Sequence, residues 1–245
     1  TMNHPRLDLY DWRARYSHDD GDLVRLFFEP ALSAAKVYRR VTGYFSAESL
    51  ALTTRGIDRL VAAGGTMELV CGFTLQPPEV EQIDRGYAIR EVVAERLRCG
   101  IAQAFEADEF TRERLGQLAW LVAHGKLDVK LAAPKTADGR FVTDAAHGVF
   151  HSKLGLVEDG FGNRLAFEGS INETGAALSR NYESFTVNCS WWGPKEVERI
   201  DGIAAEFAQF WGDTAKRAKV FEFPDAVRQE LLKHVPPKSP FLVDG

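Results

Sequence analysis

Residues 149–159, VFHSKLGLVED, place His151 and Lys153 two positions apart in an otherwise apolar run. In a β-strand alternate side chains share a face, so both would point the same way, about 6.5–7 Å apart along the backbone. Two cations on one face of an interior strand cost free energy unless an anion lies opposite. The pair therefore suggests a site for an anionic substrate. The commoner alternative is a hydrogen-bonded structural histidine beside a lysine that reaches solvent.

Two later stretches carry groups that could complete such a site. In GSIN, Ser170 with Glu173 is a capping box for a short helix, but a helix start also presents free main-chain amides to a phosphate. Gly169 would let the backbone come close, and Asn172 adds an amide donor. Glu183, in NYESF, could fix the tautomer of a histidine and stabilise its cationic form. Taken alone, GSIN is as typical of a capped helix as of a phosphate-binding site, and a lone glutamate at the start of a strand usually lies on a solvated face.

Together these residues form one spaced pattern, His-x-Lys, then Gly-Ser-x-Asn, then Glu eleven residues after the Asn. The pattern resembles the motif of the phospholipase D-like (HKD) superfamily, and most of all its single-motif nuclease branch. Residues 39–72 and 149–185 also resemble the N-terminal phospholipase D-like domain of bacterial helicase- and restriction-associated anti-phage proteins. The resemblance covers roughly residues 23–211. It rests on His151, Lys153, Gly169, Ser170, Asn172 and Glu183.

The resemblance implies a two-step phosphodiester transfer through a phosphohistidine. One imidazole attacks phosphorus while a second protonates the leaving oxygen, and water then releases the enzyme. Lys153, Asn172 and Ser170 would hold the non-bridging oxygens, and Glu183 would orient His151. Because side chains supply all the positive charge, the resemblance implies neither a metal nor a cofactor.

This mechanism needs two imidazoles, and none of the other five histidines belongs to a second His-x-Lys. A C₂ homodimer would bring His151 from each chain to a shared axis, as in single-motif members of the superfamily. His147 is a poor substitute, since an extended chain would place it about 13 Å away. The expectation is a homodimer with one composite active site.

One position departs from the motif. The superfamily has an aspartate five residues after the lysine, where this chain has Glu158 followed by Asp159. In the single-motif nucleases this acid is not the catalytic carboxylate, so both residues are left out of the predicted site. Sequence alone does not decide whether either has a role.

Alternating strand and helix patterns predict an α/β fold, a mixed and mostly parallel sheet flanked by helices on both faces. The expected strands are residues 38–45, 66–73, 127–133, 149–158, 164–170 and 182–190. The expected helices are residues 47–65, 79–105, 109–124, 171–179 and 194–213. The predicted domains are a leader (1–22), a phospholipase D-like nuclease domain (23–222) and a Pro-rich tail (223–245), expected to link to a further region.

Composition limits the functions to consider. The net charge of −5 means that affinity for nucleic acid must come from local clusters, such as residues 39–40 and 216–219. Trp191 and Trp192 could stack on bases, although core packing is commoner. Three separated cysteines, no signal peptide and no membrane-spanning apolar run favour a reduced, cytoplasmic protein.

The expected function is a metal-independent phosphodiesterase, in first place a DNA endonuclease domain, with RNA as the other polymer. Such a domain could be fused to or partnered with a helicase or ATPase in restriction or phage defence. One alternative is a lipid phosphodiesterase or phosphatidyltransferase, which would use the same chemistry. The other is a non-catalytic nucleic-acid-binding dimerisation module.

Overall fold

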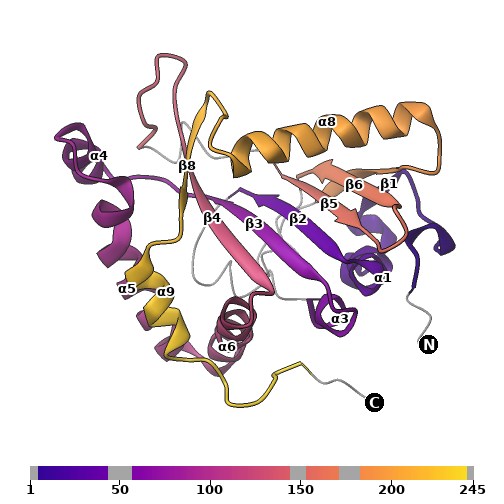
Figure 1. The fold of residues 1–245 in the computed structure, drawn as a ribbon, viewed down its shortest axis with the longest axis horizontal. Coiled ribbons are helices and arrows are strands. Elements are labelled where there is room, and N and C mark those ends of the chain that lie inside the picture. The colour runs from indigo at the N-terminus through magenta and orange to yellow at the C-terminus, as the bar shows by residue number, and fades with distance from the viewer. Residues whose placement is uncertain (1–4, 44–56, 144–152, 171–182, 242–245) are drawn as a thin grey trace.

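The computed structural model describes residues 5–43, 57–143, 153–170 and 183–241. Within these ranges eight strands form one sheet, in the order β1-β7-β6-β5-β2-β3-β4-β8 (Figure 1). The strands are β1 (Arg15–Ser17), β2 (Val37–Thr42), β3 (Thr66–Gly72), β4 (Leu127–Pro134), β5 (Leu154–Glu158), β6 (Arg164–Gly169), β7 (Ser184–Cys189) and β8 (Ala218–Glu222).

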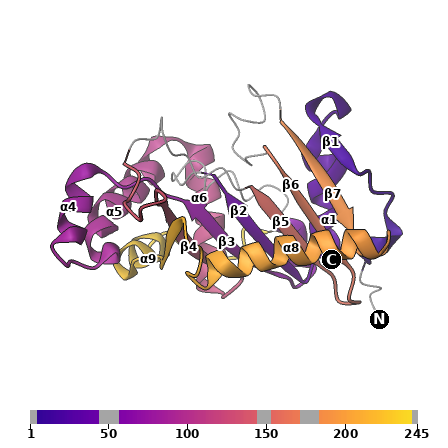
Figure 2. The same ribbon diagram turned by 90° about the horizontal axis from the view of Figure 1, so that it is seen from above.

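Helices cover both faces of this sheet (Figure 2). The described helices are α1 (Glu29–Ala34), α3 (Ile57–Ala62), α4 (Pro77–Asp84), α5 (Ile89–Ala107), α6 (Glu109–Ala123), α8 (Pro194–Trp211) and α9 (Asp225–Leu232). Shorter helical turns are η1 (Leu7–Leu9), η2 (His18–Asp20) and the π-helical η3 (Val24–Phe28).

The mixed α/β class predicted from sequence is confirmed, with less parallel pairing than expected. Among the described strands only β2, β3 and β4 pair in parallel, through the pairs β2–β3 and β3–β4. The other five pairs of the described sheet are antiparallel. The hairpin that joins β5 to β6 accounts for part of this, because a short turn can only join antiparallel strands.

Alternation along the strands divides the core into two layers. On one face Val41, Leu156 and Ala166 pack against Ile200 and Phe207 of α8. On the opposite face the remaining inward side chains form a larger core, which also takes in η3, α1, α3, α5 and α6. The two apolar faces explain why the central strands read as near-continuous apolar runs.

Several elements differ from the prediction. The expected helix over residues 79–105 is two helices, α4 and α5, because the chain turns at Gly86 with φ +97°. The short strand β8 and the helix α9 were not predicted. The expected helix over residues 171–179 and residues 47–56 of the first expected helix lie outside the described residues.

Segments expected outside the main domain take part in its structure. Residues of the predicted leader form β1, which pairs with β7, and Trp12 and Tyr16 are buried in the core. In the predicted tail, Val227 and Leu231 of α9 are buried in the same core. The domain limits themselves stay a prediction.

Candidate active site

Three described parts of the motif lie at one edge of the sheet. Lys153 directly precedes β5, Gly169 and Ser170 follow one another at the end of β6, and Glu183 directly precedes β7. Since β6 is antiparallel to both β5 and β7, the start of β5, the end of β6 and the start of β7 are neighbours. The Gly169 N–H donates to the Lys153 carbonyl (3.2 Å), and the Ser170 N–H donates to the Ser184 carbonyl (3.1 Å). Strand pairing therefore brings together groups that the sequence separates by up to 30 residues.

Lys153 lies on the face of the sheet that is turned away from α8. Leu154 and Leu156 pack with α8, so alternation places Lys153 on the other face with Val157. Its side chain is partly buried, and among the described residues no carboxylate lies within ion-pair distance of it. A partly buried ammonium without a carboxylate partner is suited to an anionic ligand.

Glu183 shares this face, since it alternates with Phe185 and Val187 of the larger core. The residue is only 4% exposed. Its Oε2 atom is shielded from solvent and accepts no hydrogen bond within the described part of the chain. A buried carboxylate oxygen of this kind needs a donor, and an imidazole N–H is the donor that the motif predicts.

Ser170 makes contacts that differ from its predicted role. Its hydroxyl accepts a hydrogen bond from the Ser184 N–H (3.1 Å) and donates to the Ser184 carbonyl (3.3 Å). These contacts extend the β6–β7 ladder by one residue, and a phosphate oxygen would have to compete with them for the hydroxyl. Phosphate binding by Ser170 stays a prediction, and His151 and Asn172 lie outside the described residues.

Gly169 allows a close approach between backbones, as the sequence suggested, but the neighbour is the protein itself. A Cβ at this position would lie 2.3 Å from the Ser184 carbonyl oxygen and 2.6 Å from the Phe185 Cα. Neither main-chain atom can move without breaking the β6–β7 pairing. Gly169 is therefore required by strand packing beside the site.

We expect Gly169→Ala to lower the free energy of unfolding by about 2–3 kcal/mol, because the added methyl group overpacks two strands. Urea denaturation measures this. The matched control is Gly202→Ala in α8, where a Cβ meets nothing within 4 Å and alanine should stabilise the helix by up to about 1 kcal/mol. Equal stabilities of the two variants would contradict the close packing.

The acidic position that departs from the motif lies at the opposite end of β5. Glu158 pairs with Arg39 on the α8 face, at 2.5 Å. Asp159 is 7% exposed and accepts hydrogen bonds from the main-chain N–H groups of Leu7, Phe161 and Asn163 and from the Asn163 side chain. Asp159 therefore holds the β5–β6 turn and fastens the N-terminal segment to it.

Asp159→Ala should lower the free energy of unfolding by about 3 kcal/mol, since the buried Leu7 N–H and two part-buried main-chain N–H groups lose their acceptor. Glu158→Gln removes a partly exposed ion pair and should change the free energy of unfolding by less than about 1 kcal/mol. Chemical denaturation of both variants provides the comparison. Because Asp159 lies about 20 Å along the strand from Lys153, turnover by the folded variant should stay within about twofold of wild type. A selective loss of turnover would instead make this acid catalytic.

Two residue pairs that were candidates for nucleic-acid binding, residues 39–40 and residues 191–192, do not lie beside Lys153. Arg39 is paired with Glu68 and Glu158, and Arg40 is fully buried with its guanidinium 4.9 Å from the centre of the Phe167 ring. Residues 191–192 follow β7 at the edge opposite Glu183, where Trp191 packs against the core. Neither pair offers a base-stacking or phosphate-binding surface beside Lys153.

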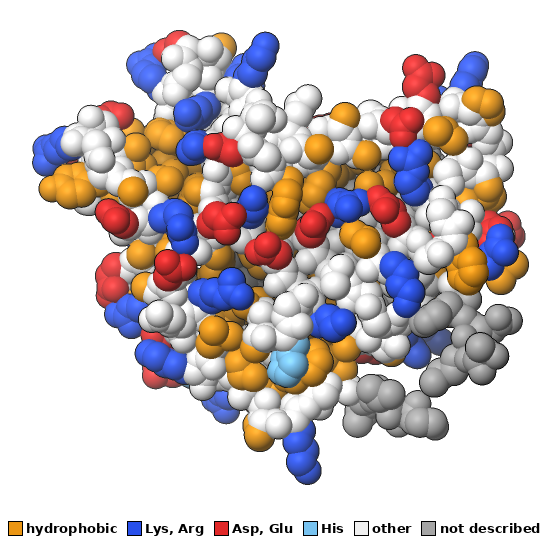
Figure 3. Space-filling model, in the orientation of Figure 1, with side chains coloured by type: hydrophobic (Ala, Val, Ile, Leu, Met, Phe, Trp, Pro, Cys, Tyr) orange, Lys and Arg blue, Asp and Glu red, His pale blue; other side chains and the backbone are white. Residues whose placement is uncertain are grey.

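Basic side chains do gather farther along the edge that carries Lys153. β2 and β4 are both parallel to β3, so the end of β4 lies at this edge, and β8 starts beside it. The Lys135 N–H donates to the Arg217 carbonyl (2.8 Å), and Arg217 Nε donates to the Lys135 carbonyl (2.9 Å). Among the described residues no carboxylate pairs with Lys135, Lys216 or Arg217. In Figure 3, Lys and Arg side chains lie near the end of β4 and the start of β8, with Asp and Glu side chains among them.

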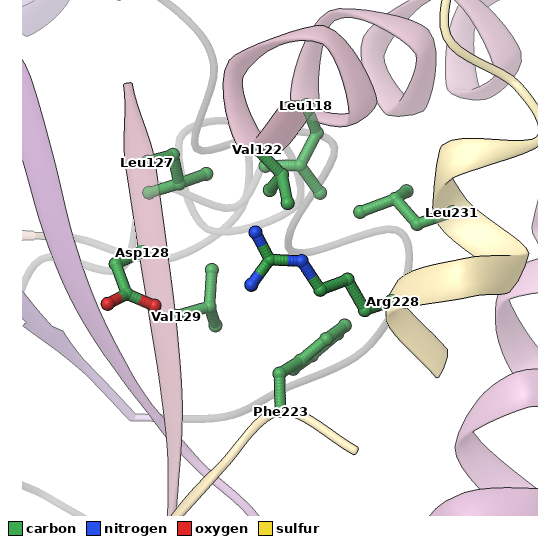
Figure 4. A pocket seen from close by; sticks show the side chains of 8 residues that line it. All are labelled: Leu118, Val122, Leu127, Asp128, Val129, Phe223, Arg228 and Leu231. Atoms are coloured by element: carbon green, nitrogen blue, oxygen red, sulfur yellow. The ribbon is translucent and has the colours of Figure 1, made fainter. Parts of the chain in front are cut away.

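A separate small pocket lies between α6, β4 and α9 (Figure 4). Its lining is mostly apolar, and the Arg228 side chain reaches into it from α9, whereas Asp128 points away from the guanidinium. The pocket opens near the start of β4, at the edge opposite Lys153. None of the described motif residues lines it.

No three His, Cys, Asp or Glu side chains of the described residues are grouped so that they could hold a metal ion. No helix in the described ranges is both long enough and apolar enough to cross a membrane.

No protein-family model and no curated protein matches the chain. Among solved structures, the chain is similar to NucT from Helicobacter pylori, with a TM-score of 0.48 and 12% identity over 84% of this chain and 97% of that one. It is also similar to phosphatidylserine synthase from Haemophilus influenzae Rd KW20, with a TM-score of 0.42 and 16% identity over 87% of this chain and 42% of that one. A third similar structure is TrmBL2, an archaeal chromatin protein, with a TM-score of 0.35 and 11% identity over 84% and 54% of the two chains.

Proposed function

We propose that the chain is a metal-independent phosphodiesterase of the phospholipase D-like type, and that its substrate is DNA. The observation that carries this proposal is the meeting of Lys153, Gly169, Ser170 and Glu183 at one sheet edge. Chain connectivity keeps His151 within two residues of Lys153, and Asn172 within two residues of Ser170. The four described groups of the motif therefore belong to the same end of three adjacent strands.

The proposed reaction has two balanced steps. A nitrogen of His151 attacks phosphorus, a P–N bond forms, the P–O bond to the leaving group breaks, and the leaving oxygen takes a proton from a second imidazole. That second imidazole then removes a proton from water, the water oxygen attacks phosphorus, and the P–N bond breaks. Lys153 and Asn172 neutralise the non-bridging oxygens, and Glu183 accepts a hydrogen bond from the His151 ring.

The basic side chains along the same edge favour nucleic acid over lipid as the substrate. Lys135, Lys216 and Arg217 have no carboxylate partner among the described residues, in a chain whose net charge is −5. A polymer of phosphates that enters the site at Lys153 can reach these cations, whereas a single lipid headgroup is too short. The same proposal includes association with a helicase or ATPase, on the strength of the sequence resemblance alone.

The direct test is a cleavage assay in the presence of EDTA. Single-stranded DNA, duplex DNA, RNA and phosphatidyl vesicles are offered to the same preparation. We expect DNA to be cleaved and the chelator to change the rate by less than about twofold, because cations of the chain do the work of a metal. Turnover of the phosphatidyl substrate alone would favour the lipid enzyme. DNA binding without turnover would favour the non-catalytic module.

The proposal includes a homodimer, since one His151 per chain supplies only half of the imidazoles. Wild-type chains can be mixed in equal amounts with His151→Ala chains and allowed to exchange, with exchange verified by native mass spectrometry. A composite site predicts about one quarter of the wild-type activity, because only one dimer in four keeps both imidazoles. A value of about one half would mean that each chain works alone.

A further inference from the structure

Glu183 is held in place by a residue that the sequence does not connect with it. The Glu183 main-chain N–H donates a hydrogen bond to the ring atom Nδ1 of His18 (3.1 Å). The main-chain N–H of His18 donates in turn to the Glu183 main-chain carbonyl (3.2 Å). The two residues are 165 positions apart and meet because β1 pairs with β7 in the register Ser17 to Ser184. The imidazole thus contacts the main chain of the proposed catalytic carboxylate.

The direction of this hydrogen bond sets the state of the His18 ring. A main-chain N–H can only donate, so Nδ1 is the acceptor and carries no proton. The neutral ring therefore has its proton on Nε2, an atom shielded from solvent. An amide oxygen placed where Nδ1 lies could accept the same hydrogen bond, but a hydrocarbon side chain could not.

The turn that carries His18 is itself well fixed. The Asp20 carboxylate accepts hydrogen bonds from the Ser17 N–H (2.7 Å) and the Ser17 hydroxyl (3.2 Å), and it pairs with Arg13 (3.0 Å). The Ser17 main-chain contact lowers the pKa of Asp20 from its ordinary value. Arg15 of β1 also donates to the Ser184 hydroxyl (3.2 Å). The start of β7 is therefore clamped by hydrogen bonds to a segment whose own turn is held by Asp20.

These hydrogen bonds oppose a movement of the Glu183 carboxylate toward solvent. The carboxylate is buried, with Oε2 accepting no hydrogen bond from the described residues, so the free energy of solvation favours a move outward. Main-chain hydrogen bonds at residue 183 resist that move and keep the side chain on the face of Lys153. Without the His18 acceptor, a buried N–H would also lose its partner.

We propose that His18 is a positioning residue of the active site, which holds the Glu183 carboxylate ready to receive an imidazole N–H. This inference rests on the proposed function, because it assigns a role through Glu183. It makes the N-terminal segment, which the sequence placed outside the domain, a part of the site.

Four single variants test the proposal with a small chromogenic phosphodiester as substrate. His18→Ala should lower kcat about 10- to 100-fold with little change in KM, as expected when a group that orients a catalytic residue is lost. His18→Asn, whose amide oxygen can replace Nδ1, should recover most of the rate, whereas His18→Gln should not. His124→Ala, which removes an exposed histidine stacked on Trp120, is the matched control.

Two further readouts separate positioning from a general effect on folding. In a Glu183→Gln background, His18→Ala should have little additional effect on kcat, because both substitutions act on one carboxylate. Additive losses would overturn the proposal, and so would a His18→Ala rate equal to that of His124→Ala. Hydrogen exchange of the Glu183 amide should be slow in wild type and His18→Asn and fast in His18→Ala. This measurement tests the clamp even if no phosphodiester is cleaved, an outcome that would instead refute the proposed function.

Discussion

Replacing His151 by alanine is expected to lower kcat/KM for DNA cleavage by about 10⁴-fold or more. The imidazole is the proposed nucleophile, and in a composite dimer its second copy is the proposed acid, so one substitution removes two functions of the site. Steady-state assays on a fluorescent oligonucleotide, with unfolding monitored in parallel, measure the effect. Water cannot take the place of the P–N intermediate at a comparable rate.

The neighbouring histidine provides the control for this result. His147 lies four residues earlier in the chain and has no place in the motif. His147→Ala should retain activity within about threefold of wild type, because substitutions away from reacting groups have small effects. A large loss in His147→Ala with a small loss in His151→Ala would reassign the nucleophile.

Replacing Lys153 by methionine should lower kcat/KM about 10³-fold. Methionine keeps the length and most of the volume of the side chain but removes the charge that faces the non-bridging oxygens, where negative charge grows in the transition state. The effect should be larger on kcat than on KM, since the stabilisation increases as the reaction proceeds. Rates measured under single-turnover conditions avoid any contribution from product release.

Lys195 is a suitable lysine for comparison. It is exposed in the first turn of α8, which follows β7 at the edge opposite Glu183. Lys195→Met removes the same charge from the chain and should leave kcat/KM within about twofold. If kcat/KM fell by the same small factor in both lysine variants, the fall would come from the change in net charge and not from a lost contact with the phosphate.

Sequence patterns predicted the central elements because each has a strong local signal. β3 is a short apolar run that follows two glycines, and β4 alternates between apolar and polar residues and ends at a proline. α8 begins at a proline and carries one apolar stripe. β8 and α9 were missed for physical reasons. β8 is a five-residue strand that follows a basic run, and α9 is a helix of eight residues, of which four are polar, so neither has a strong periodic signal.

The resemblance to a spaced motif predicted Lys153, Gly169 and Glu183 as site residues, and the pairing of β5, β6 and β7 brings these three residues to one edge of the sheet. His18 was not predictable, because its relation to Glu183 depends on the pairing of β1 with β7. Gly169 and Asp159 show the opposite case. Gly169 occupies a motif position, yet close packing against β7 explains the need for glycine there. Asp159 neighbours a motif position, and its hydrogen bonds to main-chain N–H groups give it a structural role.

The most direct test of the central claim is to trap the covalent intermediate. The protein is mixed with DNA under single-turnover conditions, quenched at alkaline pH, where phosphohistidine survives, and digested for mass spectrometry. The account predicts a nucleotide phosphoryl group on the imidazole of His151, which forms and decays with the cleavage reaction. DNA cleavage with no adduct on His151 throughout the turnover, or with the adduct on another side chain, would contradict it.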